Sequence, residues 1–274
     1  MTDVTTGTAA KRQEYYAGNN SKIADEVKRV IGIFLPRAFV LGGFDERGNL
    51  LTVQHTDYKK QIQSWLPDFF EHSFLTEPLL SDIQKLTTVF IATDKYLLTP
   101  GILYNEIAAT KWLSTIHFIE ATETVINHYD KESDVYYTYT WPSAIKKLLL
   151  SYFLKTTVLP LAAYQLNTID TRGYQLQCCI SGEQVIATLN HNGTIQWHQS
   201  FNYQTAEDIA YHIKLLCKQY NITDDELQIT CTATSNEQSE IISRLGQYFS
   251  QLQQPNNDWA NTISLFQQLY TCAL

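Results

Sequence analysis

The sequence predicts an α/β protein built from two similar halves, and three observations carry this prediction. The chain has 274 residues, enough for one large domain or two smaller ones at about 100–200 residues each. Apolar residues make up 44% and charged residues 18%, a globular composition with too few charges for a disordered chain. The order hairpin, helix, strand, helix occurs over about residues 37–112 and recurs over about residues 174–252, so the halves share a plan without repeating residues.

The first half begins with an ambiguous segment, because residues 23–34 have apolar side chains at helical spacing while the end of this segment also fits a strand. The turn-forming run at 45–49 lies between an apolar run and an alternating run, which predicts a β-hairpin over 37–58. Pro100 suits the first turn of a helix, which we expect to reach Trp112. The other expected elements of this half are strands at 86–92, 96–99, 124–128 and 135–139, a short helix over 59–70 broken near Pro67, and a helix over 143–157 that follows Pro142.

The second half shows the same plan more clearly. The Asn192-Gly193 pair between alternating runs is the strongest short-range hairpin signal, since both turn positions need a positive φ. Thr205 is expected to cap the next helix, with its hydroxyl bonded to the amide of Asp208 and the Asp208 carboxylate reaching back. The elements expected in this half are antiparallel strands at 174–180, 184–189 and 194–201, a strand at 227–233, a helix over 237–252, and a helix or strand over 259–274.

These elements predict four parts of the chain. Residues 1–20 lack periodicity and are expected to form a flexible tail, and residues 21–141 are expected to form the first lobe. The second lobe is expected over 142–254, and residues 255–274 are expected to return and pack on the first lobe. Two α/β lobes that face each other usually enclose a cleft.

The charge and cysteine content exclude several classes of protein. The 28 acidic and 20 basic residues give a net charge of −8, and no basic run is present, so a nucleic-acid partner is not expected. No apolar stretch approaches the roughly 20 residues of a membrane span, and the N-terminus lacks the pattern of a signal peptide. Five cysteines, an odd number, predict a reduced, cytoplasmic protein.

The common motifs of catalysis and metal binding do not occur, so we assign no catalytic residue and no metal ligand. Neither of the glycine-rich phosphate-binding patterns occurs, and Gly42-Gly43, the only glycine pair, is expected to form a bulge or bend. The cysteines form no C-x-x-C motif and are expected to be small core residues. No two histidines have the i, i+4 spacing of a helical metal site.

Aromatic residues are the other notable feature of the composition. There are 17 tyrosines, and five aromatic side chains gather after an acidic stretch, at Tyr129, Tyr136, Tyr137, Tyr139 and Trp141. Tyrosine and tryptophan are common in protein interfaces, because a large apolar body carries a polar tip. The cluster fits a partner-binding edge and a packed sheet edge equally well.

Two runs carry a resemblance to a known family. They are the run at 199–211, QSFNYQTAEDIAY, and the run at 93–100, TDKYLLTP, which Tyr104-Asn105 follows. Together with the two hairpins, they resemble an uncharacterised bacterial family of domain-of-unknown-function proteins to which an actin-like ATPase fold is assigned. The resemblance covers roughly residues 33–274. It implies an α/β fold of two ribonuclease-H-like lobes with mixed sheets, in the actin-like ATPase architecture.

The resemblance also implies where nucleotide would bind. In active members of the actin-like superfamily, each lobe opens with a strand, an aspartate and a glycine. The corresponding region at 30–37 has no carboxylate, and Pro36 lacks an amide donor. The region at 176–182 keeps Gly182 but has cysteine or serine in place of aspartate, and the adenosine strand at 228–236 has no glycine. The nucleotide elements are therefore expected to be degraded, as in a pseudo-ATPase.

Two functional hypotheses follow from these observations. The first is a non-catalytic actin-like scaffold or protein-binding module, which has no cofactor and binds an unknown cytoplasmic protein. The second is a divergent nucleotide-binding ATPase or phosphotransferase that binds ATP and Mg²⁺ in the cleft between the lobes. The candidate residues for the second hypothesis are Ser181, Gly182, Thr232 and Thr234 as phosphate or ribose contacts and Arg37 as the counter-charge.

Overall fold

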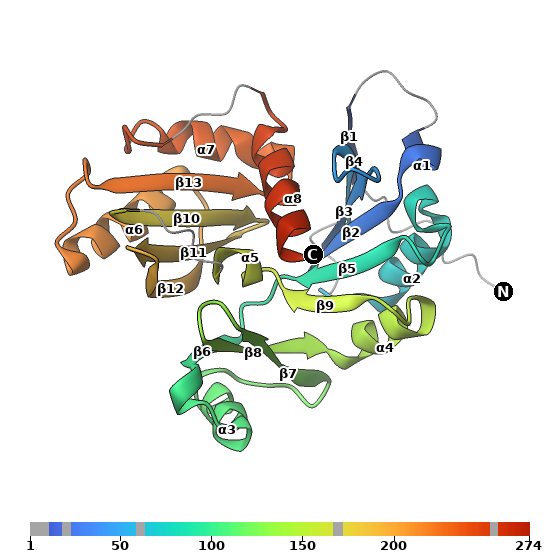
Figure 1. Ribbon diagram of the computed structural model, residues 1–274, viewed down its shortest axis with the longest axis horizontal. Helices are drawn as coiled ribbons and strands as arrows, with labels where there is room; N and C mark the ends of the chain where they lie inside the picture. Colours follow the sequence, from blue (N-terminus) through green and yellow to red (C-terminus); the bar gives the residue numbers. More distant parts are fainter. Residues whose placement is uncertain (1–10, 18–22, 59–63, 167–171, 253–256) are drawn as a thin grey trace. The chain divides into compact units, whose positions relative to one another are not determined.

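The computed structural model describes residues 11–17, 23–58, 64–166, 172–252 and 257–274, and its chain divides into two compact units (Figure 1). The first unit comprises Met1–His128, Tyr136–Leu161 and Ala273–Leu274, and the second comprises Tyr129–Val135 and Ala162–Cys272. Among the described residues, no helix is long and apolar enough to cross a membrane.

A six-stranded mixed sheet forms the centre of the first unit, in the order β1-β4-β3-β2-β5-β9. Neighbouring strands from β1 to β2 in this order pair antiparallel, whereas β5 pairs parallel to both β2 and β9. The strands are β1 (Lys11–Tyr16), β2 (Arg29–Leu35), β3 (Ala38–Phe44), β4 (Leu50–Asp57), β5 (Leu86–Ile91) and β9 (Thr157–Pro160). The predicted hairpin over 37–58 is confirmed as β3 and β4, and the ambiguous segment 23–34 consists of the short helix α1 (Ile23–Glu26) followed by most of β2.

Helices α2 (Pro67–Thr76) and α4 (Ser143–Tyr152) belong to the same unit, and the 3-10 turn η1 (Pro78–Leu80) follows α2. The rings of Phe70 and Phe74 on α2 lie 5.2 and 5.7 Å from the ring of Phe34 on β2, so α2 is held by aromatic packing on the sheet. The prediction of a helix broken near Pro67 is wrong, because Pro67 begins α2, where its fixed φ suits the first turn. The start of that predicted helix, at 59–63, lies outside the described residues.

A small sheet, in the order β6-β8-β7, carries helix α3 (Glu106–Ile116). Its strands are β6 (Tyr96–Pro100), β7 (Glu123–Asp130) and β8 (Val135–Pro142), and the 3-10 turn η2 (Gly101–Leu103) precedes α3. The prediction that Pro100 begins this helix is wrong, because the Asn105 side chain caps α3 by accepting from the amide of Ala108. Tyr137, Tyr139 and Trp141 are buried on β8.

A four-stranded sheet in the order β12-β11-β10-β13 forms the second unit. The three predicted antiparallel strands are confirmed as β10 (Tyr174–Ser181), β11 (Gln184–His191) and β12 (Thr194–Asn202), and β13 (Leu227–Ala233) pairs parallel to β10. Asn192 and Gly193 have φ of 50° and 76°, as the hairpin signal predicted. The predicted capping box of Thr205 and Asp208 is present at the start of α6 (Ala206–Tyr220).

The remaining helices of the second unit are α5 (Ala163–Leu166), α7 (Ser239–Leu245) and α8 (Ala260–Cys272), with the 3-10 turn η3 (Asn236–Gln238) before α7. The helix predicted over 237–252 is shorter than expected, since α7 ends at Leu245 and Leu252 forms a bridge with Ile229. Helix α8 contacts β13 and α5, so residues 260–272 pack within the second unit, whereas the sequence led us to expect this segment on the first lobe.

Two edge strands differ from the expected division of the chain. Strand β1 lies within residues 1–20, the expected tail, and pairs with β4; its side chains are mostly exposed, so they give no hydrophobic signal. Residues 1–10 and 18–20 lie outside the described residues. Strand β9 pairs with β5, so α4 and β9 belong to the first unit, which ends near Leu161. The sequence had led us to expect the boundary between the lobes after residue 141.

The two units share one order of elements. In each, three antiparallel strands lead into a helix and then into a strand parallel to the first strand. These sets are β2-β3-β4-α2-β5 and β10-β11-β12-α6-β13. The sequence predicted this repeated order of elements. It did not identify β2 as a strand, because residues 23–34 fitted both a helix and a strand.

Candidate functional site

Two turns occupy equivalent places in the two units. Pro36-Arg37 joins β2 to β3, and Gly182-Glu183 joins β10 to β11. Each turn lies at the carboxyl end of a strand that has a parallel neighbour, β5 or β13. Ligands of open α/β sheets bind outside the carboxyl ends of such strands, so these two turns are the candidate ligand-binding positions.

The turn of the first unit is closed by Tyr58, which follows β4. The Tyr58 hydroxyl donates to the Pro36 carbonyl at 2.8 Å, and the Tyr58 amide donates to the Arg37 carbonyl at 3.1 Å. The amide of Trp65 donates to the same Pro36 carbonyl at 2.6 Å. The Tyr58 ring is buried, with its centroid 4.5 Å from that of Phe69, and burial raises the pKa of its hydroxyl. Tyr58 is therefore a neutral donor fixed over the turn.

The turn of the second unit is closed in the same way by Tyr203, which follows β12. The Tyr203 hydroxyl donates to the Gly182 carbonyl at 2.8 Å, and the Tyr203 amide donates to the Glu183 carbonyl at 3.0 Å. Burial and the nearby Glu183 charge raise the pKa of Tyr203 to about 12, so its hydroxyl also stays protonated. Gln238 Nε2 adds a longer bond of 3.4 Å to the Gly182 carbonyl. We call these two structures the tyrosine-closed turns.

Sequence reasoning missed Tyr58 and Tyr203, although a signal was present. Both tyrosines come directly after an acidic or amide residue at the end of the third strand, as Asp57-Tyr58 and Asn202-Tyr203. Each contacts a carbonyl more than 20 residues earlier, with separations of 22 and 21 residues. A comparison of the two halves at this position would have found them.

The structure brings four of the five predicted site residues together at the ends of β10 and β13. The Thr234 amide donates to the Ile180 carbonyl at 3.0 Å, which places Thr234 beside Ser181 and Gly182. Arg37, the fifth predicted residue, is half-buried and belongs to the first unit, whereas the other four belong to the second. Thr232 Oγ1 donates to the Cys178 carbonyl at 3.4 Å and shares a 2.8 Å bond with the Tyr164 hydroxyl, so its hydroxyl faces the interior.

Three of the amides that follow β13 are already bonded within the chain. The Ser235 amide donates to Gln238 Oε1 at 3.1 Å, and Ser235 Oγ accepts from the Glu237 amide at 3.2 Å. The Gln238 amide donates to the Ser235 carbonyl at 3.3 Å. A phosphate at a strand-to-helix turn needs free backbone donors, and these three donors have internal acceptors. The Thr234 hydroxyl is fully buried and has no hydrogen-bond partner among the described residues.

A buried polar chain lies elsewhere in the second unit. Gln165 Nε2 donates to the Ile186 carbonyl at 3.1 Å, and the Thr188 hydroxyl donates to Gln165 Oε1 at 2.8 Å. The Nδ1 atom of His198 lies 2.7 Å from the Thr188 oxygen. Because the Thr188 hydroxyl already donates its proton to Gln165, its oxygen accepts in this second bond and Nδ1 is the donor. Burial lowers the pKa of His198 to about 3, so the ring is neutral at physiological pH. The network is hydrogen-bonded and structural.

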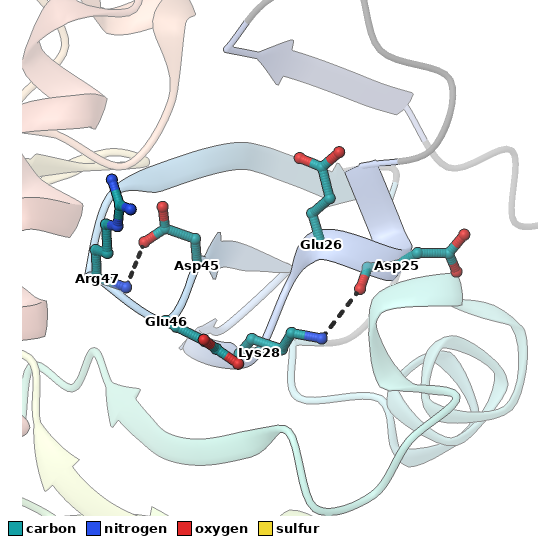
Figure 2. A pocket seen from close by; sticks show the side chains of 6 residues that line it. All are labelled: Asp25, Glu26, Lys28, Asp45, Glu46 and Arg47. Carbon is teal, nitrogen blue, oxygen red and sulfur yellow. Dashed lines mark hydrogen bonds between the residues drawn. The ribbon is translucent and has the colours of Figure 1, made fainter.

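An open depression in the first unit is lined only by charged side chains (Figure 2). These are Asp25, Glu26, Lys28, Asp45, Glu46 and Arg47. Asp45 accepts from the Asn49 side chain and from the amides of Arg47 and Asn49, each at 2.8 Å, and these bonds lower its pKa. Its carboxylate therefore shapes the β3–β4 turn. In the described part of the chain, no group of three or more His, Cys, Asp or Glu side chains could hold a metal ion.

An exposed apolar surface covers η2 and α3. Only Ala109 and Leu113 of α3 are buried. Trp112 and Ile116 continue the same apolar stripe past its covered edge, since they lie three residues beyond Ala109 and Leu113. The large apolar side chains of this segment that are between 43% and 90% exposed are Ile102, Leu103, Ile107, Trp112, Ile116 and Phe118. We call these six side chains the α3 surface.

Comparisons with known proteins agree with this architecture. A family model described as "Protein of unknown function (DUF3822)" matches residues 27–252. A solved Bacteroides thetaiotaomicron protein, described as having an actin-like ATPase fold and unknown function, aligns with a TM-score of 0.76 at 15% identity, over 93% of this chain and 100% of its own. A chain of the "PilM-PilN type IV pilus biogenesis complex" aligns with a TM-score of 0.59 at 9% identity, over 90% of this chain and 99% of its own. A comparison with curated proteins gives no match. The likeness to the solved structures establishes the actin-like ATPase fold.

Proposed function

The chain belongs to the family described as "Protein of unknown function (DUF3822)", and we propose that it is a non-catalytic actin-like scaffold that binds other proteins in the cytoplasm. Because fold alone does not assign activity, the proposal rests on the chemistry of the site.

The observation that carries this proposal is the pair of tyrosine-closed turns. In both units a tyrosine hydroxyl donates to a carbonyl of the turn that the actin-like resemblance assigns to phosphate contact. The first turn has a proline in place of an amide donor and no carboxylate that could act through Mg²⁺. The second turn has one exposed carboxylate, Glu183, and the donors after β13 are bonded internally. These residues do not fit a nucleotide phosphate with its metal ion.

The α3 surface supports the binding part of the proposal. Contiguous exposed apolar patches on monomers are rarely larger than about 300–600 Å² and often mark interaction sites. Six large apolar side chains are exposed within residues 102–118, on a segment with few charges. By analogy of fold, the neighbour from the PilM–PilN complex is consistent with an actin-like protein that works through a protein partner.

Calorimetric titration with ATP in the presence of Mg²⁺ tests the proposal. We expect no saturable heat at nucleotide concentrations up to about 1 mM, which corresponds to less than about 4 kcal/mol of binding. We also expect phosphate release no faster than in the protein-free control. Micromolar affinity together with turnover would overturn the non-catalytic assignment.

A divergent nucleotide-binding ATPase or phosphotransferase is the second candidate, and the Thr234 hydroxyl favours it. This buried hydroxyl has no partner in the part of the chain that the structure describes, and the Thr234 amide bonds the strand end just before Ser181 and Gly182. ATP and Mg²⁺ would be the cofactors in that case alone. If the titration shows binding, Thr234→Val should weaken it, because the variant removes the hydroxyl at nearly constant volume.

A further inference from the structure

Helix α4 is a basic element in an acidic protein. The whole chain carries a net charge of −8, yet residues 135–169 contain no Asp or Glu and carry three lysines. These lysines, Lys146, Lys147 and Lys155, lie on α4 or directly after it. None of them forms an ion pair with a described residue, so their charges are available to a partner.

The same element exposes leucines on its outer side. Ile145 and Leu149 are buried, whereas Leu150 is 37% exposed and Leu154, just past the helix end, is 83% exposed. Lys147 and Leu150 lie three residues apart and share one face of α4, while Leu154 and Lys155 lie in the turn that follows the helix. Each of these two places therefore presents one lysine and one leucine to solvent.

Helix α2 packs on the other side of α4. Glu71 on α2 accepts from the Tyr152 hydroxyl at 3.0 Å, and the rings of Phe74 and Phe153 lie 5.2 Å apart. At about 100° per residue, Tyr152 lies about 200° around the helix from Leu150, so α2 leaves the face of Lys147 and Leu150 uncovered. We call Lys146, Lys147, Leu150, Leu154 and Lys155 the α4 surface.

We infer that the α4 surface binds an acidic segment of another protein, in which Asp or Glu side chains alternate with large apolar ones. The inference rests on the proposed scaffold function and names the chemistry of one partner. Complementary charge fixes the register of such a segment and speeds its association, while the leucines provide the apolar contact.

Charge also separates this partner from two other occupants. Anionic membrane surfaces are recognised by clusters of about 4–8 basic residues, whereas this surface has three. A second copy of the chain carries the same net charge of −8, so the net electrostatic interaction between two copies is repulsive.

Fluorescence anisotropy with a labelled synthetic peptide tests the inference. The probe is a peptide of about 18 residues in which Glu pairs alternate with Leu and Phe, and its counterpart has every Glu replaced by Lys. We expect the acidic peptide to bind the full chain with a Kd of roughly 10–100 μM at about 50 mM salt, and to bind severalfold more weakly at about 300 mM. We expect no binding of the lysine peptide.

Two variants locate the binding on the α4 surface. Lys147→Glu with Lys155→Glu should weaken the acidic peptide at least about tenfold, as loss of central interface contacts does. Lys131→Glu with Lys218→Glu changes the net charge equally at exposed positions elsewhere, and it should weaken the peptide much less. Leu154→Gln should weaken the peptide without changing the charge. Unchanged circular dichroism of each variant establishes that its fold is intact.

Several results would overturn the inference. These are the absence of acidic-peptide binding below about 1 mM, equal binding of the two peptides, or equal effects of the two double variants. Binding to phosphatidylserine vesicles that the Lys147/Lys155 variant abolishes would assign the surface to lipid. Dimerisation in sedimentation equilibrium that the same variant abolishes would assign it to a second copy. The nucleotide titration is independent of these results, so failure of the scaffold assignment and failure of the α4 assignment are distinguishable.

Discussion

The turn at Pro36-Arg37 and the turn at Gly182-Glu183 have the same place in the repeated plan but different residues. The first has a proline, and the second has a glycine at φ +61°. In both, a tyrosine after the third strand bonds the two turn carbonyls through its hydroxyl and its amide. The shared feature is thus the tyrosine and not the turn sequence. The tyrosine after the third strand therefore closes the turn whether the turn contains a proline or a glycine.

Removing each tyrosine side chain should have the largest effect on this comparison. Tyr58→Ala and Tyr203→Ala each remove a buried ring and a hydrogen bond, which we expect to cost about 3–5 kcal/mol of unfolding free energy. The loss should be larger for Tyr58, since its ring packs on Phe69 and is 3% exposed, against 8% for Tyr203. Urea unfolding followed by circular dichroism measures both. Tyr211→Ala, at a 66% exposed tyrosine, is the control, and an equal loss there would contradict the prediction.

Acid should destabilise both units through their buried histidines. Burial lowers the pKa of His55 in the first unit to about 4 and that of His198 in the second to about 3, from 6.5. The unfolded chain therefore binds more protons below pH 6.5, and each histidine reduces stability as the pH falls from 6.5 toward its folded pKa. The slope is about 1.4 kcal/mol per pH unit for one such group.

His198→Gln should flatten this pH dependence by about 2 kcal/mol between pH 6 and pH 4.5, as measured by urea unfolding at several pH values. Gln196→Ala, at an exposed side chain that carries no charge, should leave the slope unchanged. A variant at 198 with the wild-type slope would show that this histidine does not titrate as described.

Substitutions at the turn residues themselves should change the free energy of unfolding less than removal of the tyrosine side chains. Gly182→Ala forces a side chain onto a positive φ, which costs about 1–2 kcal/mol although no heavy atom lies within 4 Å of the new Cβ. Pro36→Ala has no such strain, and we expect it to cost less than about 1 kcal/mol through greater freedom of the unfolded chain. Thermal unfolding of the two variants side by side checks the order, and a larger loss for Pro36→Ala would reverse it.

Removing the two hydroxyls alone should cost less than removing the whole tyrosine side chains. Tyr58→Phe and Tyr203→Phe each remove one donor from a carbonyl that keeps another, namely the Trp65 amide or Gln238 Nε2. We expect losses of about 0.5–1.5 kcal/mol in each unit. The Tyr58 hydroxyl also accepts from the Leu66 amide at 3.3 Å, so its loss should lie toward the upper end of the expected range. Similar values would sharpen the equivalence of the turns, whereas a loss confined to one unit would break it.

The sequence predicted those parts of the fold whose signals are local. The Asn192-Gly193 turn and the Thr205 cap depend on neighbours within a few residues, and both are present. Strands β1 and β9 were not predicted, because β1 is a mostly exposed edge strand and β9 has only four residues. Such strands are fixed by the neighbour they pair with, which leaves no periodicity in their own residues.

The site followed the same rule. Ser181, Gly182 and Thr234 were named from the actin-like resemblance, and the parallel pairing of β10 with β13 brings them together. Tyr58 and Tyr203 were missed because each acts on a carbonyl across an intervening hairpin, at separations of 22 and 21 residues. The division of the chain at residue 161 was not found either, since it depends on the pairing of β9 with β5.

Hydrogen exchange at the two tyrosine-closed turns, measured with and without about 5 mM ATP and Mg²⁺, tests the central claim most directly. A ligand at 100 times its Kd stabilises its site by about 2.7 kcal/mol, which would slow exchange in the residues it contacts. We predict that exchange in segments 34–39 and 180–185 is the same in both conditions. Slower, Mg²⁺-dependent exchange in either segment would show that a closed turn opens to phosphate and would contradict the account.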